Sequence, residues 1–177
     1  MTEVLQIVQL GHEILSSVAS PIKNISDSTL QNLIDSLIHT AQTANGVGIA
    51  APQVAQSYRL FIVASRPNPR YPDAPEMEPT AMINPVIVDV SSEQVKGWEG
   101  CLSVSGFRGK VPRYQTIKVE YQDREGKKHR QVFSDFVARI IQHELDHLDG
   151  LVFLDRLEST QDLYTEQEYE QILKEAS

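Results

Sequence analysis

Apolar residues recur at helical spacing in the N-terminal part of the chain. Six of them fall at i, i+3, i+4, i+7, i+8 and i+11, and therefore line one face of a helix: Leu30, Leu33, Ile34, Leu37, Ile38 and Ala41. Ser26 and Asp27 precede this pattern, and both residue types commonly cap helix N-termini. The sequence therefore predicts an amphipathic helix over residues 27–43.

Shorter segments rich in β-branched residues predict strands over residues 59–64, 81–90, 116–121 and 128–133. Lys118 and Glu120 alternate with apolar neighbours, as in a strand with one buried face. Gly126 lies between the last two segments, where a turn with positive φ would let them pair antiparallel. Residues 66–79 contain five of the nine prolines and are predicted to form a surface loop within the same domain, because proline cannot donate to a sheet.

Two further helices are predicted nearer the C-terminus. Residues 136–148 carry apolar side chains at helical spacing, and Gly150 is placed to end this helix. Ser159 and Asp162 have the spacing of a capping box and are expected to open a terminal helix. Because strands precede the long apolar helix, the predicted fold class is α+β.

Composition narrows the classes of function. A length of 177 residues predicts one domain over residues 1–177. The formal net charge of −8 disfavours DNA and anionic membranes as partners. No signal sequence is recognisable, and no apolar run approaches the roughly 18 residues of a membrane helix. With a single cysteine and therefore no internal disulfide, the chain is predicted to be a soluble cytoplasmic protein.

The candidate chemistry begins with the segment His143-Glu144-Leu145-Asp146-His147 on the apolar helix. Two histidines four residues apart project from one face of a helix, close enough to hold one ion, while Glu144 points to its side. Histidines that merely pack in the core are the ordinary alternative. The glutamate between them favours a metal site, and HExxH first suggests a zinc peptidase.

The third metal ligand distinguishes between types of hydrolase. The longer metzincin pattern fails, because Phe153 stands where its third histidine belongs. Glu166 and Glu168 remain formally open, although they lie on a polar segment expected to be exposed. Cys101 in Glu-Gly-Cys-Leu-Ser is the better candidate, since its thiolate would reach an ion held by the histidines. A lone cysteine without such a context is more often a small buried hydrophobe.

A third segment, Gly-Val-Gly-Ile-Ala-Ala-Pro-Gln over residues 46–53, lets a backbone approach a ligand closely and ends in an amide side chain. Taken alone, it favours an ordinary glycine turn into a strand. It is not a dinucleotide-binding fingerprint, because Ala51 replaces the third glycine, and phosphate binding is not indicated.

Together, GVGIAAPQ, EGCLS and QHELDH resemble the three characteristic motifs of the peptide deformylases, in that family's order. The resemblance runs from the N-terminal helix to Leu154 and includes Val111 to Arg113 and the pair Ala138-Arg139. It implies an α+β fold with antiparallel β-sheets packed around a central helix that bears HExxH, together with an N-terminal amphipathic helix and a C-terminal helix. It also implies an enzyme that removes the formyl group from the N-terminal formylmethionine of newly made polypeptides and releases formate.

Residue by residue, the resemblance implies that Cys101, His143 and His147 hold one divalent metal ion. Fe²⁺ is expected, and Zn²⁺, Ni²⁺ or Co²⁺ can substitute. Glu144 is expected to act as the acid and base, and the Gln53 amide and the Leu102 backbone N–H as donors to the oxyanion.

The resemblance also implies that the substrate is an N-formylmethionyl peptide, which binds next to the metal. Close walls formed by Gly46, Val47 and Gly48 are expected to exclude larger acyl groups. Val47, Phe136 and Ile140 are expected to line the pocket for the methionine side chain. A zinc endopeptidase and a non-catalytic metal-binding or partner-binding module are the alternatives, although a structural metal site would have no need of Glu144 as a base.

Some positions depart from the family pattern. Asp135 stands where many relatives carry glycine and is expected to be a helix N-cap, and Ser105 stands where proline is frequent. Arg108 and Arg113 are expected to pair with Glu99 or to bind peptide, and for Arg108 a solvated surface charge fits equally well.

The tail after residue 156 contains six acidic residues and one base. Some bacterial deformylases dock on the ribosome through a basic C-terminal helix. An acidic tail would be repelled by RNA, so ribosome docking is not expected for this chain. It is expected to be monomeric.

Overall fold

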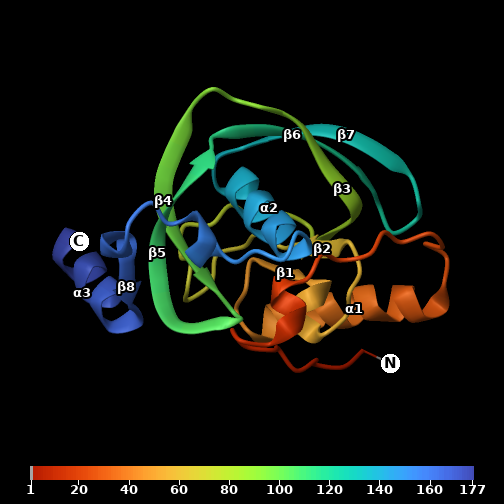
Figure 1. Cartoon of the computed structure of the whole chain (residues 1–177), viewed down its shortest axis with the longest axis horizontal. Helices are drawn as coiled ribbons and strands as arrows, with labels where there is room; N and C mark the ends of the chain where they lie inside the picture. The colour runs from red at the N-terminus through yellow and green to blue at the C-terminus, as the bar shows by residue number, and fades with distance from the viewer. Residues whose placement is uncertain (1) are drawn as a thin grey trace.

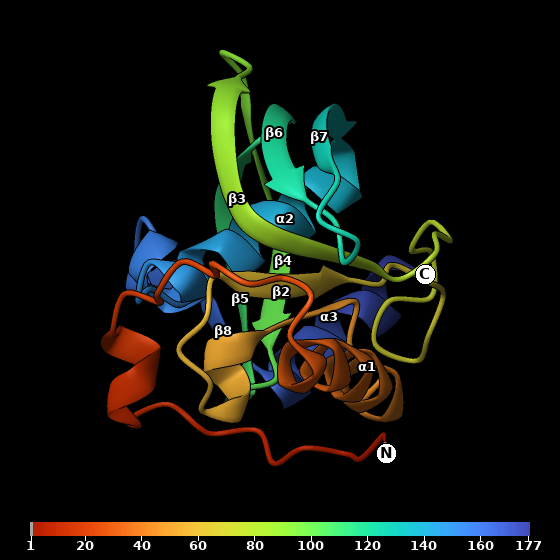
Figure 2. The ribbon, with the colours of Figure 1, turned by 90° about the vertical axis from the view of Figure 1, so that its right-hand side faces the viewer.

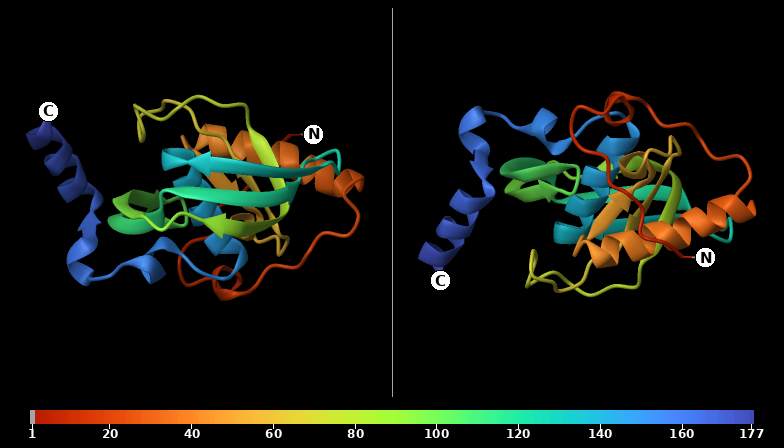
Figure 3. Two further views of the ribbon diagram at one scale, coloured as in Figure 1. Left: turned by 90° about the horizontal axis from the view of Figure 1, so that it is seen from above. Right: turned by 90° about the horizontal axis from the view of Figure 1, so that it is seen from below.

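A computed structural model describes residues 2–177. Within that range the chain forms two antiparallel sheets and three α-helices, which is the α+β class predicted from the sequence. Helix α1 lies toward one end of the molecule, and the C-terminal helix lies at the other end (Figures 1 and 3). None of the helices in the described part of the chain is long and apolar enough to cross a membrane.

Helix α1 (Ser28–Thr43) confirms the predicted amphipathic helix. Its N-cap is Asp27, whose side chain accepts hydrogen bonds from the backbone N–H groups of Thr29 and Leu30 at 2.8 Å and 3.3 Å. Its buried face carries Ile34 and Leu37, which pack in one apolar cluster with residues of β1 and β2. Figure 2 shows α1 beneath β2, on the side of the sheet nearer the N-terminus.

The larger sheet has five strands in the order β1-β2-β3-β6-β7, and every pairing is antiparallel. Its strands are β1 (Gly48–Ala50), β2 (Leu60–Val63), β3 (Thr80–Val90), β6 (Thr116–Gln122) and β7 (Lys128–Ser134). The four predicted strands correspond to β2, β3, β6 and β7. The predicted turn before β7 is also present, with Gly126 at a φ of 84°.

The smaller sheet has three strands in the order β4-β5-β8. They are β4 (Gln94–Cys101), β5 (Val104–Tyr114) and β8 (Leu163–Thr165), and none of them was predicted as a strand. β4 contains two glycines and three polar or charged residues, and β5 contains glycine, proline and charged residues, so neither has the apolar alternation that marks a strand. Pairing between β4 and β5 holds these segments extended.

Helix α2 (Asp135–Leu148) packs against strands of both sheets, including β1 and β2 of the larger one and β5 of the smaller one (Figure 1). Ala138, Ile141 and Leu148 are buried in a cluster with Phe61 and Met82 of the larger sheet. The helix ends at Leu148 with Asp149 as its C-cap, and Gly150 follows with a φ of 76°, the left-handed conformation expected of the predicted terminating glycine. Burial on several sides therefore fixes the orientation of the polar residues that α2 carries.

Two predicted helix starts were wrong. Asp135 is not the N-cap of α2, because Ser134 takes that position and Asp135 is its first residue, with a left-handed φ of 57°. Glycine adopts this conformation without strain, and aspartate tolerates it better than most residues. The tail helix α3 (Glu166–Ala176) begins after β8, where Thr165 and Glu168 form the capping box. Ser159 caps only a short 3₁₀ turn, Thr160–Asp162.

Candidate active site

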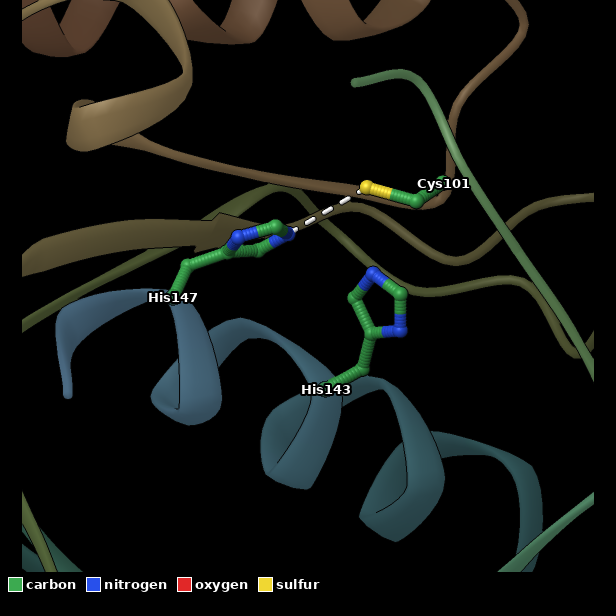
Figure 4. Close-up of side chains that lie close together, drawn as sticks. All are labelled: Cys101, His143 and His147. Atoms are coloured by element: carbon green, nitrogen blue, oxygen red, sulfur yellow. Dashed lines mark hydrogen bonds between the residues drawn. The ribbon is translucent and has the colours of Figure 1, made fainter. Parts of the chain in front are cut away.

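Cys101, His143 and His147 meet between the two sheets, and their ligand atoms all lie within 4.8 Å of one another. The histidines come from successive turns of α2, and the cysteine comes from the end of β4. The Cys101 Sγ lies 3.4 Å from Nε2 of His147, and Figure 4 shows a nitrogen of each ring turned toward the sulfur. All three side chains are buried.

Glu99 fixes the orientation of His143. Its Oε1 lies 2.8 Å from Nδ1 of the ring, so Nδ1 donates to the carboxylate and Nε2 is left as the ligand atom. Arg113 and Arg139 also donate to this carboxylate, at 2.9 Å and 2.8 Å. Burial alone would raise the pKa of Glu99, but these hydrogen bonds with Arg113 and His143 hold it well below its ordinary value. Glu99 is therefore a permanent anion behind the ligand.

The same surroundings favour a thiolate at Cys101. Burial would raise the pKa of the thiol, but the charges and hydrogen bonds of His147 and His143 hold it well below its ordinary value. Metal bonds of about 2.3 Å to sulfur and about 2.0 Å to nitrogen at a tetrahedral angle place the two ligand atoms roughly 3.5 Å apart. The observed separation of 3.4 Å between Cys101 and His147 fits this geometry. The donor set of one thiolate and two imidazoles thus fits a divalent transition metal.

Glu144 lies beside this group and lacks a hydrogen-bond partner for one oxygen. Its buried Oε2 is unpaired among the residues described, and the residue lines the same cavity as Cys101. Burial raises the pKa of Glu144 to about 7, while the two histidines oppose this shift. A carboxyl group that titrates near neutrality can both accept and return a proton. Gly48 makes room for it, because a Cβ there would lie 2.7 Å from Oε1 of Glu144.

The Gln53 amide approaches the sulfur from the 3₁₀ turn Ala51–Val54. Its Oε1 accepts a hydrogen bond from the Ala50 backbone at 2.9 Å, which turns Nε2 toward Cys101 Sγ at 3.5 Å and Ser103 Oγ at 3.2 Å. Leu102 follows the cysteine and lines the same cavity. The structure thus brings both sequence-predicted oxyanion donors next to the proposed metal ligands.

One cavity contains the predicted substrate residues as well. Gly46, Val47, Gly48, Phe136 and Ile140 all line it, together with Cys101, His143 and Glu144. His147 lies deeper and is not part of the lining. Sequence reasoning gave no catalytic, metal-binding or substrate-binding role to six other lining residues: Arg70, Tyr71, Trp98, Glu99, Gly100 and Arg139. Arg70 and Tyr71 belong to the proline-rich loop, and no periodicity of the sequence brings that loop to the site.

The two arginines after the cysteine have different surroundings. Arg113 pairs with Glu99, as predicted, and also donates to Asp146 at 2.7 Å. Arg108 is neither a solvated charge nor a partner of Glu99, because it is only 1% exposed and donates to Glu166 through Nε at 3.1 Å. Its Nη1 donates to the Tyr71 hydroxyl at 3.1 Å. The tail folds onto β5 and buries Arg108. The sequence around Arg108 gave no sign of this burial.

Comparison of the sequence with known proteins identifies its family. Residues 4–162 match the model of the polypeptide deformylase family. The chain belongs to the polypeptide deformylase family. It is 64% identical to peptide deformylase 2 of a Nostoc species over 97% of this chain and 96% of that protein. It is 48% identical to peptide deformylase 2 of Shewanella oneidensis over 86% of this chain and 83% of that protein.

Solved deformylase structures share this fold. A class I type b peptide deformylase from Acinetobacter baumannii, bound to Met-Ala-Ser, superposes with a TM-score of 0.86 at 48% identity, covering 89% of this chain and all of that one. The same enzyme bound to actinonin superposes with a TM-score of 0.81 at 43% identity, with coverage of 89% and 100%. Deformylases are enzymes, so family membership decides against a non-catalytic module and against an endopeptidase.

Proposed function

We propose that this chain is a metal-dependent hydrolase that removes the formyl group from the N-terminal formylmethionine of newly made polypeptides and releases formate. One observation carries the proposal: a Cys/His/His group and a buried glutamate with an unpaired oxygen occur together at one cavity of a deformylase fold. The product-like peptide Met-Ala-Ser bound to the Acinetobacter baumannii relative supports a peptide substrate.

In this proposal Cys101, His143 and His147 hold one divalent ion, and Fe²⁺ is expected, with Zn²⁺, Ni²⁺ or Co²⁺ able to replace it. When bound, such an ion supplies Lewis-acid chemistry, since it can lower the pKa of a water ligand from about 15.7 to about 7. Three protein ligands leave a position for that water. Glu99 supports the site by fixing the His143 ring.

Glu144 is proposed to move the proton. As a carboxylate it takes a proton from the attacking water, and it then gives the proton to the departing amine of methionine. Glu144 suits this role because its buried Oε2 has no hydrogen-bond partner among residues 2–177, so this oxygen is left to exchange a proton with water or substrate. The water oxygen bonds to the formyl carbon, the C–N bond breaks, and formate and a free N-terminus result.

Gln53 and Leu102 are proposed to stabilise the oxyanion that develops on the formyl oxygen. Gln53 is suited to this role because its carbonyl is held by Ala50, so its Nε2 stays aimed at the Cys101 side of the cavity. A single preorganised donor of this kind is worth roughly 10²- to 10³-fold in rate. Gln53→Ala should therefore lower kcat by about that factor while the enzyme keeps its metal.

The cavity walls are proposed to select the formyl group and the methionine side chain. Gly46 and Gly48 bring backbone close to the reacting centre, and a Cβ on Gly46 would lie 3.0 Å from Cδ1 of Leu102. Little room is left for an acyl group larger than formyl. Val47, Phe136 and Ile140 supply the apolar lining for methionine.

We further propose that residues 1–177 form a single catalytic domain, since the tail packs back onto β5 and β8. The acidic tail, in which Glu158, Asp162 and four residues of α3 carry negative charge, argues against docking on ribosomal RNA. The monomeric state and the location in a bacterial-type cytoplasm stay predictions.

The proposal is tested with one peptide series. Formyl-, acetyl- and unblocked Met-Ala-Ser are incubated with the metal-loaded enzyme, and formate and free amine are measured beside the metal content. Formate from the formyl peptide alone is the expected result. Cleavage of an internal bond of the unblocked peptide, or no formate from any preparation that contains metal, would overturn the proposed function.

The expected metal has its own test. Iron next to a ligating thiolate should make the activity sensitive to oxygen. Aerobic purification is therefore expected to lower both activity and iron content relative to anaerobic purification. Equal activity and metal content in the two preparations would contradict the expectation of Fe²⁺.

A further inference from the structure

Arg70 lies in the proline-rich loop between β2 and β3, which Figure 2 shows projecting beyond the strands on the same side as the C-terminus. Its side chain is half-buried and lines the same cavity as Cys101 and Glu144. Nothing in the proposed deformylation step uses this cation, although it faces the space that a bound peptide must occupy.

The two arginines that line the cavity differ in their partners. Arg139 is fully engaged, because it donates to Glu99 at 2.8 Å and to the carbonyls of Val111 and Val95 at 2.8 Å and 2.6 Å. Arg70 forms no ion pair with any carboxylate among residues 2–177. Its guanidinium instead lies 5.7 Å from the centre of the Tyr71 ring. Arg70 is therefore the cavity arginine whose donors are left for a ligand.

The backbone at Arg70 is held in place from both sides. Asn68 Oδ1 accepts hydrogen bonds from the backbone N–H groups of Arg70 and Tyr71, at 2.9 Å and 3.1 Å. The Tyr71 hydroxyl accepts from Arg108, which is buried and bound to Glu166 of the tail. The Tyr71 ring also contacts Phe136, with 5.4 Å between ring centres. A guanidinium on such a fixed loop loses less conformational entropy when it binds an anion.

We propose that Arg70 is a specificity-determining residue that binds the carboxylate of an acidic side chain in the first few residues after the formylated methionine. The inference rests on the proposed function. A guanidinium matches a carboxylate with two parallel N–H donors, and charged hydrogen bonds of this kind are stronger than neutral ones. The net charge of −8 would otherwise repel acidic peptides, so a local cation in the cleft changes which sequences are processed.

The test compares peptides that differ only in charge. Formyl-Met-Glu-Ala-Ser and formyl-Met-Ala-Glu-Ser are each paired with the peptide that carries glutamine in place of glutamate, and all are amidated at the C-terminus. The native metal-loaded enzyme is expected to prefer glutamate over glutamine by about three- to tenfold in kcat/KM at one of the two positions, mainly through KM. The preference should shrink at high salt, because the cleft is open to solvent.

Two variants separate a charge contact from a structural role. Arg70→Gln should bring the glutamate-to-glutamine ratio close to one, whereas Arg70→Lys should keep part of the preference. The matched control is Arg130→Gln on β7, whose side chain is 65% exposed and pairs with Glu120, and it should keep the full preference. Because each ratio is taken within one enzyme preparation, a change in folding or metal content does not alter it.

Several outcomes would overturn the inference while leaving the proposed function intact. Equal kcat/KM for the glutamate and glutamine peptides is one, and a preference that survives in Arg70→Gln is another. A third outcome comes from the same glutamine peptides made with a free C-terminus: a preference for this carboxylate over the amide, without any effect of glutamate, would mean that Arg70 recognises chain ends. If no formyl peptide yields formate, the proposed function fails instead.

Discussion

The two sheets are stabilised in different ways. In the five-stranded sheet, β2 is completely buried and its side chains pack with α1 on one face and α2 on the other. The three-stranded sheet has a small apolar cluster around Phe153 and instead buries charged side chains: Glu99, Arg108 and Arg113. One sheet therefore supplies apolar burial, and the other supplies the cysteine and the charges behind it.

This difference indicates that apolar packing in the larger sheet mainly stabilises the fold, whereas the charges of the smaller sheet mainly position the candidate metal ligands. Apolar burial is non-directional and tolerates small changes of volume. A buried charge network is directional, and loss of one partner leaves the others unpaired. Substitutions of buried apolar side chains in β2, β3 and β6 are therefore expected to change stability alone, whereas substitutions in the charge network around Glu99 should change stability and metal binding together.

The largest expected effect comes from the end of β4. Cys101→Ala removes the sulfur ligand, so bound metal and deformylation should both be lost nearly completely while the fold is kept. Metal analysis, circular dichroism and formate release check this expectation. The control is Ser103→Ala, two residues away, which should retain the metal because Ser103 Oγ only accepts a hydrogen bond from Gln53. A Cys101→Ala enzyme with normal metal content would show that the thiolate is not a ligand.

The second prediction uses one substitution in each sheet. Glu99→Gln removes the charge between His143, Arg113 and Arg139, and should lower the free energy of unfolding by about 3–5 kcal/mol. It should also weaken metal binding by roughly 10- to 100-fold, since Glu99 fixes the His143 ring.

The matched variant in the larger sheet is Glu120→Gln, which removes an exposed partner of Arg130 and should cost about 1 kcal/mol or less without changing the metal affinity. Urea unfolding and metal titration of both variants measure the difference. Similar losses in the two sheets would contradict the contrast between them.

A smaller loss of stability is expected when a substitution creates a small cavity in the core of the larger sheet. Ile83→Val removes one methylene group from a fully buried side chain of β3, and should lower the free energy of unfolding by about 0.5–1.5 kcal/mol. Metal affinity and kcat should stay at their wild-type values. A loss of metal in this variant would mean that packing of the larger sheet positions the ligands more directly than the contacts indicate.

The smallest effect is expected at the turn between β6 and β7. Burial opposes ionisation of Asp123, but its hydrogen bonds with His129 and with the backbone of Lys127 and Glu125 together outweigh it and hold the pKa of Asp123 below the ordinary value of 3.8. A carboxyl group with a depressed pKa in the folded state stabilises the protein above its unfolded pKa, and this contribution is lost as the pH falls through the folded value.

Asp123→Asn should therefore cost about 0.5 kcal/mol near pH 6, and the cost should shrink as the pH falls through the folded-state pKa of Asp123. Denaturation of both proteins over a series of acidic pH values, with Glu125→Gln as a control for substitution in the turn, measures this difference. A cost that does not change with pH would contradict the electrostatic explanation.

Four strands of the larger sheet were predicted from the sequence, whereas all three strands of the smaller sheet were missed. Residues of β6 alternate apolar and polar at Lys118 and Glu120, and the other predicted segments are rich in β-branched residues, so β2, β3, β6 and β7 were predicted within one or two residues. The strands β4, β5 and β8 were missed because the partner strands hold them extended. The start of α3 was misplaced because Ser159 also offers a local cap, and pairing of β8 with β5 decides which one opens the helix.

The candidate site was predictable as far as it depends on motifs. Spacing along α2 places His143 and His147 on one face, and the isolated Cys101 had no better explanation than metal ligation. By contrast, the sequence held no signal for Arg70, Tyr71 or the buried Arg108, whose positions depend on the loop and the tail folding toward the cavity.

The sequence by itself determined the amphipathic helices, the alternating strands and the residue types of the metal group, because these follow from local periodicity and ligand chemistry. Only the tertiary structure decided which charges are buried together and which cation is left unpaired. The reason is that hydrogen bonding and desolvation depend on distances between segments far apart in the chain, such as the 3.1 Å between Arg108 and Glu166.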